Sequence, residues 1–185
     1  MKKFIKSYLT AFIVLIAVIM NGCDIFENFQ FGLPVRFEIE ALTTAGNPLG
    51  SQTFCFESND TYQQYEDDIN SINFVAAYIV TLDVFPAALT GNAKLRLYEY
   101  NQTTQQVGKM LFEHTENNYT PAEHDSTNAY KLNLTADQIA EINQSLLTGP
   151  KCFYGEYEVE VASPNVLNYV KVRIDALFNV DAKLD

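Results

Sequence analysis

The sequence predicts an all-β fold in which two antiparallel sheets pack face to face. Several segments alternate apolar and polar residues with a period of two, and clusters of Gly, Pro and Asn separate these segments. Only two short stretches have helical spacing. Seven or eight such strands with few helices favour a two-layer β-sandwich, and a closed barrel or an α+β sheet is the alternative.

The predicted strands follow one another along the chain. The segment 35–41 alternates apolar residues with Arg and Glu, which is typical of a half-buried strand. The segment 72–84 is apolar on both faces and ends before Pro86, so we expect a central strand that is covered on both sides. Further alternating strands are expected at 93–100, 105–113, 129–134, 154–162 and 170–180.

Two short helices interrupt these strands. Ser58-Asn59-Asp60 can cap a helix over residues 61–68, and Thr135 with Gln138 forms a capping box for a second helix. Gly149-Pro150 stops the second helix. The predicted fold is therefore a two-layer antiparallel β-sandwich of the Ig-like or Greek-key type with two short helices.

The charge is divided unevenly along the 185 residues, which have a net charge of −11. The first 22 residues contain Lys2, Lys3 and Lys6 and no acid, whereas the chain from Cys23 onward has 9 basic and 23 acidic residues, or −14. Nucleic acid is excluded as a partner because phosphate contacts need clustered Lys and Arg. The acidic body is also too apolar for a disordered chain, and its length suits one domain.

Residues 1–22 have the features of a signal peptide. The basic start precedes an apolar run from Tyr8 to Met20, which is too short to span a bilayer comfortably. The sequence Met20-Asn21-Gly22-Cys23 resembles the lipobox of bacterial lipoproteins, in which a small residue precedes the lipidated Cys. This resemblance implies an N-terminal signal helix and acyl chains on Cys23, which would anchor the protein stably in a membrane. An ordinary secretory signal and an uncleaved anchor are the alternatives.

The resemblance also implies a domain organisation and a location. The lipidated Cys23 and a short tether are expected over residues 23–33, followed by a single β-sandwich domain over residues 34–185. The predicted location is the bacterial cell envelope, where the lipid on Cys23 contacts the membrane. The outer membrane is preferred over the inner one, although Asp24 resembles the inner-membrane retention signal of enteric bacteria.

Cys55 and Cys152 then remain as a pair in an exported domain, and we predict a disulfide between them. On a strand, Cys55 lies on the face opposite to Phe54 and Phe56, where a free thiol would be exposed to oxidation. Two independent small residues are the alternative. No CxxC motif is present, so the sequence predicts neither a zinc site nor any other metal or cofactor.

No constellation of catalytic residues is apparent, and we expect no enzymatic activity. Both histidines lie in the polar stretch 113–125, whose spacing matches no metal-ligand motif. We interpret this stretch as an exposed loop. His124-Asp125-Ser126 contains the residue types of a catalytic triad, but neighbours in sequence cannot form that relay. Glu156, Glu158 and Glu160 are interpreted as a charged outer face of a strand.

Tyr98 and Tyr100 are the candidate recognition residues. They share a predicted strand face with Lys94 and Arg96, and exposed aromatic rings beside polar groups can bind a glycan or a protein partner. Amphipathic tyrosines on an outer sheet face are the alternative. The sequence thus predicts a membrane-anchored extracytoplasmic lipoprotein that serves as a non-enzymatic recognition, assembly or envelope-structural module. A small-ligand carrier, with a lipid or sugar in or on the sandwich, is the alternative function.

Overall fold

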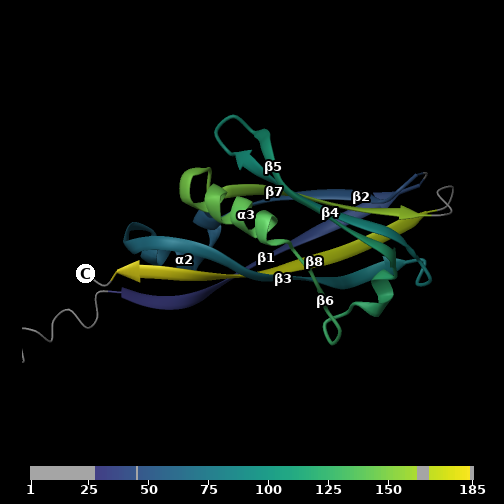
Figure 1. Ribbon diagram of the computed structural model, residues 1–185. Helices are drawn as coiled ribbons and strands as arrows, with labels where there is room; N and C mark the ends of the chain where they lie inside the picture. Colours follow the sequence, from purple (N-terminus) through teal and green to yellow (C-terminus); the bar gives the residue numbers. More distant parts are fainter. Residues whose placement is uncertain (1–27, 45, 162–166, 184–185) are drawn as a thin grey trace, which may run out of the picture.

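The computed structural model describes residues 28–44, 46–161 and 167–183, and the predicted signal peptide 1–22 and Cys23 lie outside these ranges. Eight β-strands make up most of the described chain (Figure 1): β1 (Asn28–Thr43), β2 (Leu49–Cys55), β3 (Ile69–Phe85), β4 (Gly91–Asn101), β5 (Gln106–Tyr119), β6 (Tyr130–Lys131), β7 (Cys152–Val161) and β8 (Asn168–Lys183). Two α-helices lie between them, α2 (Asp60–Tyr65) and α3 (Ala136–Thr148). The 3-10 helices are Phe56–Ser58, Glu66–Asp68 and Pro121–Glu123.

The strands form two four-stranded antiparallel sheets. One sheet has the order β1-β8-β3-β6, and the other has the order β2-β7-β4-β5. Figure 1 shows the two sheets as layers stacked on each other, so the predicted two-layer β-sandwich with two short helices is confirmed. This order of eight strands is that of a jelly roll, which consists of two Greek keys.

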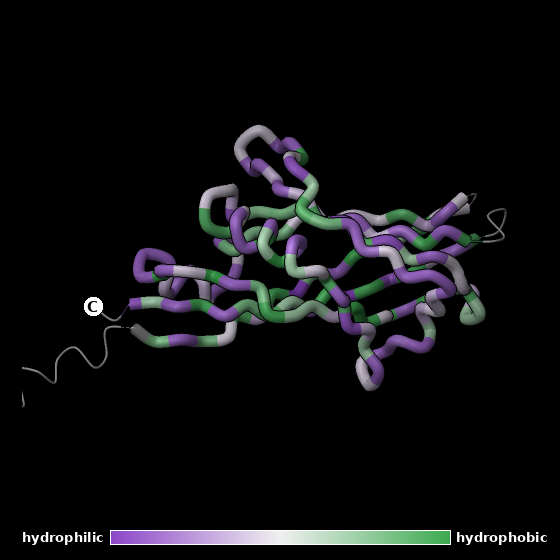
Figure 2. The backbone as a smooth tube through the Cα atoms, in the orientation of Figure 1, coloured by the Kyte–Doolittle hydropathy of each residue, from purple (hydrophilic) through white to green (hydrophobic). Residues whose placement is uncertain are grey.

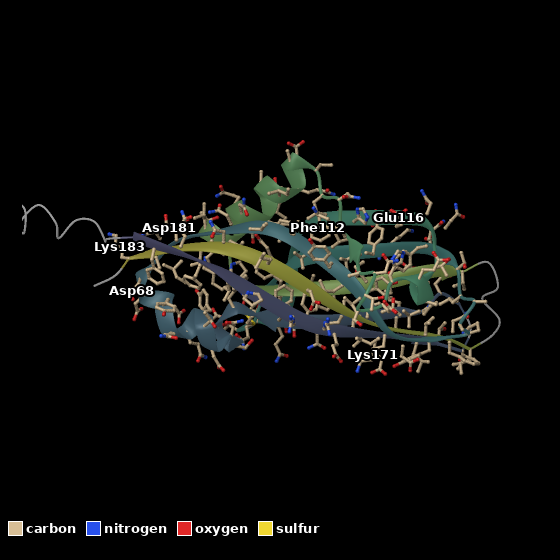
Figure 3. All side chains as sticks on the ribbon, turned by 90° about the horizontal axis from the view of Figure 1, so that it is seen from below. Asp68, Phe112, Glu116, Lys171, Asp181 and Lys183 are labelled. Carbon is tan, nitrogen blue, oxygen red and sulfur yellow. A yellow bond between two sulfur atoms is a disulfide. The ribbon has the colours of Figure 1, made fainter. Side chains whose placement is uncertain are left out.

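The long strands β1 and β8 run the full length of the domain. They pair without interruption from Asn28↔Lys183 to Thr43↔Asn168. At about 3.3 Å per residue, the 16 residues of β1 extend for about 50 Å. Figure 3 places Lys171 and Lys183 toward opposite ends of the domain, and the start of β1 lies beside the end of β8 (Figure 1).

The start of β1 corrects the predicted tether. Residues 28–33 belong to the sheet, so the domain begins before the expected boundary at residue 34. Phe29 and Phe31 continue the inward alternation of the strand, and their rings lie 5.2 and 5.1 Å from the ring of Tyr65 near α2. Only residues 23–27 of the predicted tether therefore lie outside the described domain.

The core lies between the inner faces of the two sheets, and Figure 2 shows hydrophobic and hydrophilic residues alternating along the strands. Ile39, Tyr157 and Val172 are fully buried. An aromatic group fills one part of the core, where the ring of Phe178 lies 5.0 Å from Phe56 in an edge-on arrangement. The alternation predicted for 170–180 therefore places its apolar residues correctly.

Strand β3 differs from its prediction in two ways. Its pairing with β8 is shifted between Phe74 and Ala76 and again between Thr81 and Asp83, so one continuous inward face does not exist. An uninterrupted alternation would place Phe74 and Tyr78 on the same face. Phe74 packs against the core, but Tyr78 is 37% exposed. The outer face is also uncovered, because Val75 is 52% exposed. β-Bulges change which side a strand presents, and the period of the sequence does not reveal them.

Helix α3 covers the open edge between the two sheets. Its capping box is present, since the Thr135 hydroxyl accepts a hydrogen bond from the amide of Gln138 at 3.2 Å, and the Gln138 side chain accepts one from the amide of Thr135 at 2.8 Å. The Asn143 side chain accepts a hydrogen bond from the backbone amide of Phe74 at 2.8 Å. Strand β6 has only two residues and leaves much of the edge of β3 unpaired. The helix therefore provides a hydrogen-bond acceptor for one of the backbone amides at this edge.

Candidate functional site

The outer face of the sheet β2-β7-β4-β5 carries a group of aromatic and apolar side chains. We call this group the tyrosine surface, and it consists of Tyr98, Tyr100, Val107, Met110 and Tyr154. Tyr98 pairs with Met110 on one side and with Tyr154 on the other, and Tyr100 pairs with Val107. Directly opposed residues of antiparallel strands point to the same side of a sheet, so these five side chains share one face.

The tyrosine surface is accessible to a partner. Val107 and Met110 are 47% and 49% exposed, and Tyr98, Tyr100 and Tyr154 are half-buried. The rings of Tyr98 and Tyr154 lie 6.0 Å apart. The structure thus brings the predicted residues Tyr98 and Tyr100 together with three residues that the sequence alone did not indicate, because cross-strand pairing decides which residues are neighbours.

A ladder of ion pairs lies beside the tyrosine surface on the same face. Arg96 donates to Glu113 at 2.6 Å and to Glu158 at 3.2 Å, and Lys94 contacts Glu160. The hydrogen bond between Lys94 and Glu160 raises the pKa of the lysine and lowers the pKa of the glutamate. The predicted charged outer face of β7 is therefore present, and its acids neutralise the neighbouring bases.

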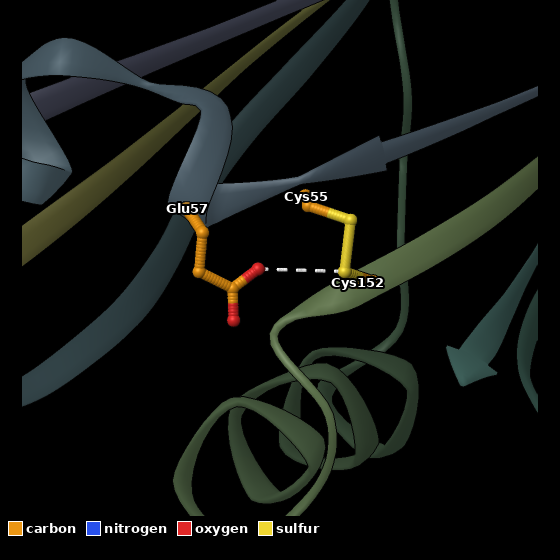
Figure 4. A group of neighbouring side chains, drawn as sticks. All are labelled: Cys55, Glu57 and Cys152. Carbon is orange, nitrogen blue, oxygen red and sulfur yellow. Dashed lines mark hydrogen bonds between the residues drawn. A yellow bond between two sulfur atoms is a disulfide. The ribbon is translucent and has the colours of Figure 1, made fainter. Parts of the chain in front are cut away.

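The predicted disulfide between Cys55 and Cys152 is confirmed. It joins the last pair of residues in the register of β2 and β7, where the two Cα atoms are 4.0 Å apart (Figure 4). A carboxylate oxygen of Glu57 lies 3.4 Å from Sγ of Cys152, and three potential metal ligands therefore gather here. Both sulfur atoms are engaged in the disulfide, so neither is available as a metal-binding thiolate.

A surface pocket of about 280 Å³ opens beside this disulfide. The residues that line it come from β2, from the 3-10 helix after β2 and from the turn after β4: Thr53, Phe54, Cys55, Glu57, Ser58 and Gln102. The side-chain oxygen of Gln102 lies 3.6 Å from Sγ of Cys152. The pocket adjoins the tyrosine surface, because Thr53 pairs with Tyr154 and Gln102 follows Tyr100 by two positions.

The structure corrects the interpretation of His114 as a loop residue, whereas His124 does lie in the connection between β5 and β6 and is half-buried. Strand β5 continues to Tyr119, and His114 lies on it and forms a hydrogen bond of 3.1 Å with the Tyr130 hydroxyl. Tyr130 also donates to Glu116, and the ring of His124 stacks on Tyr119 at 4.8 Å. We call these five residues the His–Tyr cluster, and they fill the sandwich edge between β5 and β6.

A bulge in β5 makes the His–Tyr cluster possible. Asn118 has a φ of 56°, and an extra residue enters β5 between the pairs Ala93↔Glu116 and Gly91↔Tyr119. Asn tolerates this left-handed conformation better than most residues. The extra residue lets Tyr119 point inward like Glu116, three positions earlier, and burial raises the pKa of Tyr119 to about 12. An even alternation along the sequence would have placed Tyr119 outside.

The His–Tyr cluster should make the stability of the domain depend on pH. Burial lowers the pKa of His114 below its usual value of 6.5, and the nearby Glu116 carboxylate opposes this shift in part. The folded state therefore disfavours the protonated imidazole, and His114 contributes stability above about pH 6.5 that is lost as the pH falls. We expect His114→Gln to flatten the fall of the melting temperature between pH 7.5 and 5, as measured by circular dichroism.

A control for this pH prediction is the outward neighbour of His114 on the same strand. Thr115 is exposed, so Thr115→Ala should keep the wild-type dependence of melting temperature on pH. An unchanged slope in His114→Gln would show that other groups dominate the response to acid.

The space between the two sheets is small. The apolar cavity there measures about 30 Å³, and its lining includes Phe37, Leu97 and Phe112. Ligand pockets usually measure about 300 Å³ or more, so a lipid or sugar would have to separate the sheets in order to enter. The predicted carrier alternative would therefore have to hold its ligand on the outside of the sandwich.

Comparisons with known proteins add no function. No protein-family model matches the chain, and no curated protein matches it. Solved structures similar to this chain include that of turnip yellow mosaic virus (TM-score 0.41, 7% identity, covering 85% of this chain and 82% of that chain). Others are a decameric BFDV capsid protein (TM-score 0.41, 10% identity, 83% and 99% covered) and tobacco necrosis virus (TM-score 0.39, 11% identity, 85% and 98% covered). The assignment of the jelly roll rests on the strand order itself.

Within the described ranges, none of the helices has the length and apolar character that a membrane span requires.

Proposed function

We propose that this chain is a lipid-anchored lipoprotein of the bacterial cell envelope whose sandwich is a non-enzymatic recognition module. The tyrosine surface is the single observation that carries the recognition role. Tyr and Met are enriched at protein interfaces, and such residues contribute most where a surrounding polar rim excludes water from them. Met110, Tyr98 and Tyr154 form a row across three neighbouring strands, and the ion pairs of Arg96 lie beside this row.

The anchor is supported by the leader and by the position of β1. Cys23 in the lipobox-like sequence precedes the first described strand residue, Asn28, by five positions. Four intervening residues reach about 14 Å at most. Lipid on Cys23 would thus hold the end of the sandwich where β1 begins close to the bilayer, with the outer membrane as the preferred location. The net charge of −14 from Cys23 onward would keep the domain off an anionic surface.

Replacing Cys23 tests the anchor. Cys23→Ser removes the thiol that carries the lipid, and we expect the protein to move from the membrane fraction to the soluble envelope fraction. Mass spectrometry of the wild-type protein should find acyl chains on Cys23 as the first mature residue. An unmodified Cys23, or cleavage at another position, would contradict the lipoprotein assignment.

A surface variant is the matched control in the same experiment. Tyr98→Ala combined with Tyr100→Ala should leave the protein in the membrane fraction, because neither residue belongs to the leader or carries the lipid. Photo-crosslinking from the position of Met110 in intact cells should yield an adduct in the wild type and lose it in this double variant. Equal adduct yields from both proteins would show that the tyrosine surface makes no contact with a partner.

A further inference from the structure

We infer that the pocket beside the disulfide, together with the adjoining rings of Tyr100 and Tyr154, binds a neutral saccharide. This inference rests on the proposed function of the tyrosine surface and names its ligand. Three features of the site lead to it: aromatic faces at the rim, hydrogen-bonding groups in the pocket and an acidic surrounding. Each of them is set by the register of β2, β7 and β4.

The aromatic rings offer the apolar part of the site. A pyranose ring has a face of C–H groups that packs on an aromatic ring, while its hydroxyl groups remain free for hydrogen bonds. Tyr98 and Tyr154 lie next to each other with ring centroids 6.0 Å apart, and Tyr100 is the next outward residue of β4. Successive sugar rings of a chain can therefore lie along this row.

The pocket offers the polar part. The Glu57 carboxylate accepts hydrogen bonds, the Gln102 amide both donates and accepts, and the Thr53 hydroxyl does both. In the part of the chain that the structure describes, neither the Gln102 amide nitrogen nor the Thr53 hydroxyl has a hydrogen-bond partner, and Glu57 and Gln102 are exposed. The mixture of donors and acceptors matches the hydroxyl groups of a sugar.

Charge favours a neutral sugar over an anionic one. Glu57 lines the pocket and Glu156 stands beside Tyr98, whose hydroxyl donates to it at 3.2 Å. The bases on this face, Lys94 and Arg96, are already paired with carboxylates. Lys151 interacts electrostatically with Glu57, and its ammonium group donates to the backbone carbonyl of Leu146. A phosphate or uronate would therefore meet Glu57 and Glu156, while Lys94 and Arg96 are engaged by other carboxylates.

The size of the pocket fits one ring of a longer chain. Its volume of about 280 Å³ is slightly below that of a pocket that encloses a complete drug-sized ligand. One sugar ring would enter between Glu57 and Gln102, and the next rings would lie over the tyrosines. We therefore expect an oligosaccharide to bind more tightly than its monosaccharide.

Calorimetric titration of the full-length protein in a zwitterionic detergent tests this inference. The probes are cellohexaose, xylohexaose, maltohexaose and laminarihexaose, with an oligogalacturonate as the anionic probe. We expect at least one neutral hexasaccharide to bind and the oligogalacturonate not to bind. Tyr100→Ala and Gln102→Ala should each weaken the neutral interaction at least tenfold, whereas Tyr78→Ala, on the outer face of the opposite sheet, should leave it unchanged.

Several outcomes would overturn the inference. Binding that survives both Tyr100→Ala and Gln102→Ala places the sugar elsewhere, and tighter binding of the oligogalacturonate contradicts the charge argument. Thermal melting of each variant separates a lost site from a lost fold. If none of the neutral probes binds but the photo-crosslinked adduct at Met110 still depends on Tyr98 and Tyr100, the saccharide is refuted and the proposed recognition role stands with a protein partner.

Discussion

Replacing Phe178 by Ala is expected to lower the free energy of unfolding by about 3 to 5 kcal/mol. Phe178 lies on β8, is 5% exposed, and has its ring 5.0 Å from Phe56 and 5.7 Å from Phe74. Its side chain also lines the small apolar cavity between the sheets. Truncation would therefore lose the transfer energy of the ring and enlarge an existing cavity, which adds to the cost. Urea unfolding followed by circular dichroism measures the change.

The neighbouring residue is a matched control for this substitution. Leu177 precedes Phe178 on the same strand but points to the outer face and is 39% exposed. Leu177→Ala should cost less than about 1 kcal/mol, since it removes little buried surface. Similar losses for the two variants would mean that the inner and outer faces of β8 are not as described.

The period of the sequence predicts the faces of β8 and β1 because these strands pair without a bulge. Phe178 and Val180 are buried as the alternation indicates, and the inward residues Leu33 and Ile39 of β1 follow the same rule. The same rule is wrong for β3, where the shift in pairing between Phe74 and Ala76 turns Tyr78 outward. A bulge inserts one residue into a strand without leaving a clear mark in hydrophobicity.

The sequence period also does not show which residues from different strands become neighbours in the candidate sites. Tyr98 and Tyr100 could be proposed from one strand, but their neighbour Tyr154 comes from β7, and only the strand order brings it alongside. The sequence predicts an exposed loop over residues 113–125, which contain four of the five residues of the His–Tyr cluster. The cluster forms because the bulge at Asn118 lets Tyr119 face inward, where it meets His124. Contacts between distant segments are set by topology, which local periodicity does not encode.

The disulfide is the exception, since a contact between distant segments was predicted correctly. Cysteine pairing follows from counting and from the expected compartment, so neither strand order nor register was needed. The structure adds where it lies: at the last pair of β2 and β7, beside the pocket that contains Glu57 and Gln102. Its effect should therefore extend to both the stability of the fold and the shape of this pocket.

Replacing both Cys55 and Cys152 by Ala is expected to destabilise the domain by about 4 kcal/mol. The bond closes a chain segment with a sequence separation of 97, and its loss restores conformational freedom to the unfolded state. Melting of this double variant should match that of the wild type treated with a phosphine reductant, because both lack only the cross-link. Thr53→Ala, a nearby change that keeps the bond, should melt close to the wild type.

Two results would separate the possible origins of this stability. The strand β2 pairs with β7 over only seven residues, so without the bond its end should fray before the rest of the domain unfolds. Hydrogen exchange should then rise at Phe54 and Phe56 in the double variant, while β8, paired on both sides, stays protected. If exchange rises equally in both strands, the bond acts on the whole fold through the unfolded chain. If neither stability nor exchange changes, pairing and core packing alone hold β2 in place.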